Sequence, residues 1–167
     1  NRSDMTPEHF RNRSVTDVFE PGSTVKPFTI SMALASGRFS VETPVSTSPG
    51  IHYVGRHPVR DIHDYGDLTL GGVLIKSSNV GTAKVAMELA PEELYGILDK
   101  VGFGQATGIE LSGEVGGSLL KRERWRPIEH ATLSFGYGLS STQVQLARAY
   151  AVLASGGMLR PVTLKRR

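Results

Sequence analysis

Glu-Pro-Gly-Ser-Thr-Val-Lys-Pro-Phe, residues 20–28, places a serine and a lysine three positions apart at the expected start of a buried helix. Residues three apart share a helix face, so the side chains of Ser23 and Lys26 can meet. A desolvated, uncharged lysine can take the proton of a serine hydroxyl, which is otherwise a poor nucleophile. The free N–H groups of a helix start favour negative charge near Ser23. The stretch predicts a nucleophile with its base, although Ser23 could instead only cap the helix.

The residues after Lys26 predict a central helix over about residues 23–36. Pro27 suits the first helical turn, and Gly37 supplies a stop. Apolar side chains cover nearly the whole circumference: Phe28, Ile30, Met32, Ala33, Leu34 and Ala35. A helix that is apolar all round is typically buried. Ser23 and Lys26 are therefore expected at the edge of the hydrophobic core, from which water is excluded.

A second segment whose side chains could take part in catalysis is Lys-Ser-Ser-Asn, residues 76–79, which lies between two expected helices. As a short turn between rigid helices, it would hold Ser77 and Asn79 in fixed positions. In one site with the nucleophile, Ser77 could relay a proton and Asn79 could bind an amide or carbonyl group of a ligand. The alternative is that Ser78 or Asn79 only caps the second helix.

Together the two segments resemble the penicillin-recognising serine acyltransferases, which comprise cell-wall transpeptidases, DD-carboxypeptidases and serine β-lactamases. Ser-x-x-Lys at a helix start, followed by Ser-x-Asn, is the signature of that family. Four stretches look like class B (monofunctional) penicillin-binding proteins: residues 11–27, 76–81, 134–139 and 145–150. The resemblance covers nearly the whole chain and is closest to the division-septum transpeptidase of Gram-negative bacteria.

The resemblance implies a catalytic or binding role for four of the matching residues. Ser23 would be the nucleophile that a D-Ala-D-Ala stem peptide acylates, and Lys26 would be the base that activates it. Ser77 would assist proton transfer to the leaving amine. Asn79 would bind the amide of the substrate.

Two further residues are expected at the edge of the same site. Tyr137, in a Phe-Gly-Tyr-Gly turn, resembles an aromatic residue that lines the acyl-donor cleft. Glu20 precedes the serine by one turn and could reach the cleft edge to bind substrate, although a salt bridge is the role that we expect first.

One motif of the resembled family is absent from the sequence, the Lys-Ser/Thr-Gly triplet of an edge strand. That strand supplies an oxyanion N–H donor, and the loss of one such donor costs about 10²–10³ in rate. We therefore expect the chain to be the N-terminal part of a transpeptidase domain that is inactive alone. A second chain or a C-terminal segment with the third motif would complete it.

The expected fold class is α+β, of the penicillin-recognising serine transpeptidase and β-lactamase type. The mostly helical part would be present, and the main antiparallel sheet would be incomplete. After the nucleophile helix we expect a loop-rich insertion over residues 40–67, which around Ile51 forms either a loop or a hairpin. A helical region over residues 68–155 and the entry of a strand over residues 158–165 would follow.

Charge and composition weigh against other classes of function. The net charge is +3, and the basic residues cluster only at residues 121–126, which we interpret as a solvated turn or a clamp rather than a nucleic-acid site. Zero cysteines exclude a disulfide, a zinc–thiolate site and a cysteine nucleophile. The histidines between residues 52 and 63 lack the spacing of a metal site. No cofactor, metal or nucleic-acid partner is expected.

The predicted function is that of a peptidoglycan DD-transpeptidase of septal cell-wall synthesis, which β-lactams inhibit covalently. The resemblance implies stem peptides as substrates, divisome membrane proteins as partners, and a periplasmic location with an inner-membrane anchor outside this sequence. A serine β-lactamase and a β-lactam-sensing domain without turnover stay open as alternatives. Class A β-lactamases need Glu-x-x-x-Asn for deacylation, and residues 110–114 end in Glu instead. An unrelated domain with chance motifs is the remaining alternative.

Overall fold

The computed structural model describes residues 11–165, which fall into two units. The larger unit consists of residues 20–98 and 120–139. The smaller unit consists of residues 11–19, 99–119 and 140–165. Helices and short strands occur together, so the architecture is α+β.

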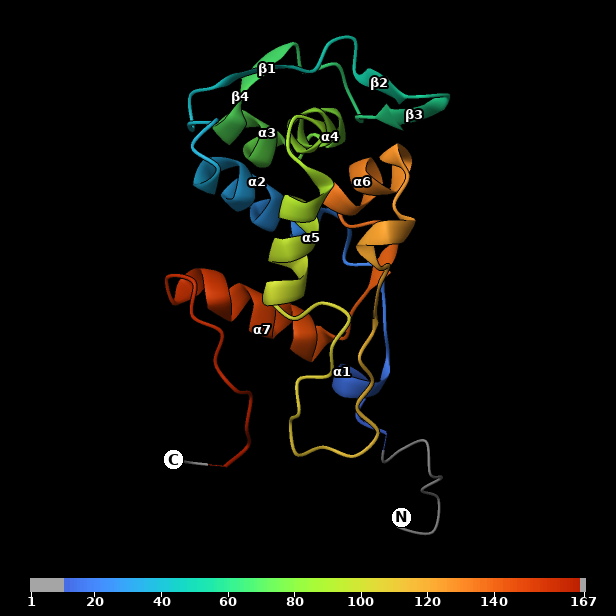
Figure 1. Cartoon of the computed structure of the whole chain (residues 1–167), viewed down its shortest axis with the longest axis vertical. Helices are drawn as coiled ribbons and strands as arrows, with labels where there is room; N and C mark the ends of the chain where they lie inside the picture. Colours follow the sequence, from blue (N-terminus) through green and yellow to red (C-terminus); the bar gives the residue numbers. More distant parts are fainter. Residues whose placement is uncertain (1–10, 166–167) are drawn as a thin grey trace. The chain divides into compact units, whose positions relative to one another are not determined.

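The larger unit is built around α4 (Asn79–Met87), which contacts α2 (Lys26–Ala35), α3 (Leu70–Lys76) and α6 (Pro127–Ser134) (Figure 1). Most of α4 is buried, and its buried residues are valines and small residues: Val80, Gly81, Thr82, Ala83, Val85 and Ala86. At Gly81 an added Cβ would lie 2.6 Å from a methyl group of Val73, so only glycine permits this approach of α3 and α4.

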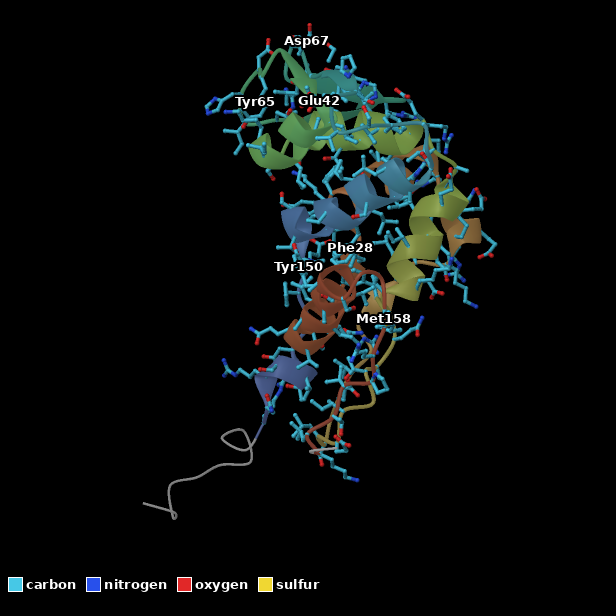
Figure 2. All side chains as sticks on the ribbon, turned by 90° about the vertical axis from the view of Figure 1, so that its left-hand side faces the viewer. Phe28, Glu42, Tyr65, Asp67, Tyr150 and Met158 are labelled. Atoms are coloured by element: carbon cyan, nitrogen blue, oxygen red, sulfur yellow. The ribbon has the colours of Figure 1, made fainter. Side chains whose placement is uncertain are left out.

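The insertion before α3 forms two short antiparallel strand pairs. β1 (Pro44–Ser46) pairs with β4 (Asp67–Thr69), and β2 (Ile51–Val54) pairs with β3 (His57–Arg60). Of the two alternatives left open near Ile51, a loop or a hairpin, the structure has the hairpin. The side chains of Glu42, Tyr65 and Asp67 lie toward the β1–β4 end of this unit, away from Phe28 (Figure 2).

A hydrophobic cluster joins the β2–β3 hairpin to α4 and α6. Its buried members are Val54, Val59, Val80, Ala83, Ala131 and Phe135, and Ile128 packs against them. The Thr29 hydroxyl donates a hydrogen bond of 2.7 Å to the Ser134 carbonyl and so ties α2 to α6. The β2–β3 hairpin, α4 and α6 thus share one core, and α2 is bonded to its α6 side.

The nucleophile segment differs from expectation in its first turn. Ser23 lies in a 3₁₀ helix, η3 (Gly22–Val25), and α2 begins only at Lys26. Pro21 and Val25 occupy the cap positions of η3 and α2, so Ser23 does not serve as an N-cap. The helix is also not buried all round, because Leu34 near its end is exposed.

The basic residues at 121–126 match both parts of the interpretation: Lys121, Arg124 and Arg126 are exposed, and Arg122 bonds to a neighbouring segment. Arg122 and Arg124 belong to a second 3₁₀ helix, η4 (Arg122–Arg124). Arg122 forms a salt bridge of 2.5 Å with Glu92, near the start of α5 (Pro91–Lys100). The buried Trp125 donates its indole N–H to the Leu120 carbonyl at 2.8 Å.

The smaller unit contains α1 (Arg13–Thr16), α7 (Gln143–Ala154) and β5 (Ser118–Leu119). The strand β6 (Leu139–Ser140) lies at its boundary. The buried Gln145 side chain organises the loops, since its amide donates to the carbonyls of Gln105 and Gly116 at 2.7 and 2.6 Å.

The strand expected over residues 158–165 is not formed, because this segment makes no ladder with another strand. Within residues 11–165, every helix is too short or too polar to cross a membrane.

Candidate active site

Lys26 and Ser23 meet as the three-residue spacing predicted. The Lys26 ammonium group donates a hydrogen bond of 3.0 Å to the Ser23 hydroxyl oxygen. Lys26 is only 1% exposed, whereas Ser23 is open to solvent. The solvent-accessible Ser23 hydroxyl is thus hydrogen-bonded to the amine of a buried lysine.

The same amine also contacts Ser77, which is far away in the sequence. Lys26 Nζ donates a hydrogen bond of 2.9 Å to the Ser77 hydroxyl and another to the Ser77 backbone carbonyl. Ser77 ends α3 in the left-handed conformation, with φ 54°. Ser23, Lys26 and Ser77 therefore form one cluster with the lysine at its centre.

Burial changes the acid–base character of Lys26. Desolvation lowers the pKa of Lys26 from its usual 10.5 to about 8, and the negative charge of Asp61 opposes this shift. About a tenth of the amine is then neutral at pH 7. A neutral lysine is a base strong enough to accept the proton of a hydroxyl during nucleophilic attack.

Ser78 takes the capping role that the sequence left open for this turn. Ser78 caps α4, because its hydroxyl accepts a hydrogen bond of 2.8 Å from the Gly81 N–H. The Asn79 side chain donates a hydrogen bond of 3.2 Å to the Arg60 carbonyl of β3. The Asn79 amide is thus oriented by the β2–β3 hairpin.

Asp61 is a site residue that sequence reasoning did not identify. Its carboxylate accepts hydrogen bonds from the Ser78 hydroxyl and the Asn79 N–H, both at 2.5 Å, and from the Val80 N–H at 3.0 Å. In the sequence, Asp61 was visible only as an acidic residue among loop histidines. No local pattern links it to Ser78, 17 residues later.

Tyr137 and Glu20 lie in two loops that are bonded to each other. The Gly22 N–H donates to the Gly136 carbonyl at 3.0 Å, and the Gly138 N–H donates to the Glu20 carboxylate at 2.9 Å. In the described part of the chain, Glu20 forms no salt bridge, so it holds the Tyr137 turn in place of the expected ion pair. Tyr137 itself is 49% exposed.

Asn79 and Tyr137 share a pocket of about 320 Å³. Its other lining residues come from β3, from α6 and from the residue after α6, and are mainly apolar: Pro58, Val59, Arg60, Ile128, Thr132 and Phe135. Of the sequence-predicted residues, Ser23, Lys26 and Ser77 thus meet in one cluster, and Asn79 and Tyr137 line one pocket. Within residues 11–165, no three histidine, aspartate or glutamate side chains come close enough to hold a metal ion.

Gly136→Ala should destabilise the Tyr137 turn more than Gly138→Ala. Both glycines have φ near +90°, which costs an alanine about 1–2 kcal/mol at either position. At Gly136 the added Cβ would also lie 1.9 Å from the Gly22 carbonyl oxygen, and relieving that overlap should cost a further 1–3 kcal/mol, roughly. Urea denaturation of both variants measures the difference. Equal losses would contradict the close approach of the two loops.

A serine paired with a desolvated lysine and a second serine hydroxyl is the arrangement that Ser–Lys acyltransferases use. The chain belongs to the penicillin binding protein transpeptidase domain family, whose model matches residues 1–167. This membership confirms the resemblance and the fold class expected from the sequence.

Individual relatives agree with this assignment. The chain is 43% identical to a probable peptidoglycan D,D-transpeptidase, PbpC, of Pseudomonas aeruginosa, over 99% of this chain and 29% of that protein. It is 44% identical to the peptidoglycan D,D-transpeptidase FtsI of Escherichia coli K12, over 98% of this chain and 28% of that protein. The transpeptidase domain of Burkholderia pseudomallei penicillin-binding protein 3 superposes with a TM-score of 0.91 at 46% identity, covering 94% of this chain and 47% of that one. The chain thus spans less than a third of the length of these two relatives.

Proposed function

We propose that this chain is part of a peptidoglycan DD-transpeptidase that cross-links stem peptides during septal cell-wall synthesis. The observation that carries the proposal is the position of the Lys26 amine, buried and within 3.0 Å of the hydroxyls of both Ser23 and Ser77. This geometry supplies a nucleophile, its base and a second proton carrier in one cluster.

The proposed reaction begins when neutral Lys26 accepts the proton of the Ser23 hydroxyl. The Ser23 oxygen attacks the carbonyl carbon of the penultimate D-Ala, and the bond to the terminal D-Ala breaks. Ser77 passes a proton to the leaving amine while it remains bonded to Lys26. An amine of a neighbouring stem peptide then attacks the ester, forms the cross-link and releases Ser23.

A β-lactam follows the first steps of the same reaction, because it mimics the substrate. Attack by Ser23 opens the four-membered ring, but the leaving nitrogen stays attached to the acyl group and does not diffuse away. Deacylation is then slow, and the enzyme stays blocked. Asn79 is proposed to bind the substrate amide, and Tyr137 to line the acyl-donor side, because both border the pocket next to the reactive cluster.

The cellular setting is proposed from the relatives' names. A septal role implies a periplasmic domain of a protein anchored in the inner membrane, with divisome membrane proteins as partners. The third motif, Lys-Ser/Thr-Gly, would come from a segment outside this sequence. That segment is needed to complete the oxyanion site, so activity is expected only in a domain that contains it.

Labelling with a fluorescent penicillin tests this function in a complete transpeptidase domain that contains the sequence. We expect one covalent adduct, on Ser23, with a lifetime much longer than the time needed for acylation. The same domain should transfer the acyl group of a stem-peptide thioester to an amine. Rapid loss of the adduct by hydrolysis would instead indicate a β-lactamase.

The pH dependence of acylation should reflect the lowered pKa of Lys26. Since the neutral amine is the base, the rate constant is expected to rise with pH through a midpoint near 8 and then level off. Stopped-flow measurements with a penicillin between pH 6 and 10 give the midpoint. A midpoint near the ordinary lysine value of 10.5 would contradict a desolvated base.

A further inference from the structure

Asp61 occupies the N-terminal end of α4, where the chain passes from the Ser77–Ser78 turn into the helix. One carboxylate oxygen accepts the N–H groups of Asn79 and Val80, and the other accepts the Ser78 hydroxyl. The first N–H groups of a helix lack partners within the helix, and a negative charge there is favourable. Asp61 therefore binds the turn at three successive residues.

The residue before this anchored segment is Ser77, whose position depends on its neighbours. Its left-handed backbone costs a non-glycine residue about 1–2 kcal/mol, so surrounding contacts have to maintain it. On one side Ser77 is held by three contacts with Lys26 and the end of α3. On the other side the chain is held by Asp61 through Ser78.

We propose that Asp61 is a positioning residue for acylation, which holds the 77–79 turn against Lys26 and acts on Lys26 through its charge. This inference rests on the proposed acyl transfer at Ser23. Asp61 does not touch Ser23 or the reacting atoms. It keeps the Ser77 hydroxyl within hydrogen-bonding distance of the Lys26 amine and holds Asn79 at the edge of the pocket that it lines.

The charge of Asp61 adds an effect that packing alone does not produce. Burial lowers the pKa of Lys26, and the Asp61 carboxylate raises it part of the way back. In the described part of the chain, Asp61 is the charged group that acts on Lys26. Lys76 of α3, Lys84 of α4, and Glu129 and His130 of α6, on the helices that α2 contacts, do not. Removing the charge of Asp61 should therefore lower the pKa of Lys26 further.

The test compares Asp61→Asn, Asp61→Ala and Asp64→Asn in the complete domain. Asparagine keeps the shape of the side chain and one oxygen that can accept the helix N–H groups, whereas alanine removes every contact. Asp64 is the matched control, because it lies in the same loop but bonds to Ser48 and Gly66 at 2.9 Å and not to the turn. The measured quantities are the acylation rate constant with a penicillin between pH 6 and 10 and the thermal midpoint of unfolding.

We expect the rate plateau at high pH to fall about tenfold or more in Asp61→Ala, and less in Asp61→Asn. In both variants the midpoint of the pH profile should move to lower pH, and Asp64→Asn should match the unmodified domain. Two results would overturn the proposal: Asp61 variants that behave like Asp64→Asn, or a lower plateau with an unmoved midpoint, which general loosening would also produce. If the unmodified domain is not labelled on Ser23, the proposed function fails instead.

Discussion

Replacement of Ser23 by alanine is expected to abolish covalent labelling by penicillin in the complete domain. The hydroxyl that lies 3.0 Å from the Lys26 amine is the atom that forms the ester, and alanine offers no substitute. Losses of about 10⁶ in turnover accompany removal of a serine nucleophile in a well-studied protease, so no adduct should be detected on the time scale of normal labelling. Intact-protein mass spectrometry after incubation with penicillin gives the readout.

Ser31→Ala is the matched control for this experiment. Ser31 lies on the same helix, α2, and its replacement also removes one hydroxyl group without changing Ser23 or Lys26. We expect full labelling of the control. An adduct of normal yield on the Ser23→Ala variant would show that another residue is the nucleophile.

Lys26→Met is expected to slow acylation by about 10²–10⁴, the usual contribution of a general base. Methionine fills much of the same space but cannot accept a proton from Ser23 or bond to Ser77. Its apolar side chain also suits a position that is 1% exposed, so the variant should remain folded. The acylation rate constant and the thermal midpoint together separate loss of chemistry from loss of structure.

Lys84→Met provides the comparison for the lysine. Lys84 is also partly buried and also bonds to a backbone carbonyl, that of Ser46 at 2.6 Å, but it lies on α4 outside the cluster. We expect its acylation rate to stay normal. The rise of the rate near pH 8 should disappear in Lys26→Met alone. Acylation of Lys26→Met at the normal rate would mean that Lys26 is not the base.

The elements nearest to the reactive pair were the easiest to predict. Ser23 and Lys26 are one turn apart, so their contact follows from local geometry. The stop of α2 at Gly37 follows from a single residue whose backbone preference is strong. The 3₁₀ form of the Ser23 turn was not predicted, because it differs from an α-helix by small changes in the same dihedral angles.

Residues that act through distant partners were harder to assign. Glu20 was expected in a salt bridge, but it accepts the N–H of Gly138, a residue 118 positions away. The strand expected over residues 158–165 was likewise wrong because it depends on a partner distant in the sequence. Its apolar sequence permits a strand, but a strand forms only when a neighbour supplies the hydrogen bonds.

The sequence by itself determined the family, the contact between Ser23 and Lys26, and the helices around them, because these depend on motifs and on contacts within one or two turns. Only the tertiary structure decided that Ser77 meets Lys26 across 51 residues and that Asp61 bonds to the residues that follow Ser77. It also decided the lowered pKa of Lys26, since that shift arises from burial. Burial and long-range proximity are properties of the packed core, and no short stretch of sequence contains them.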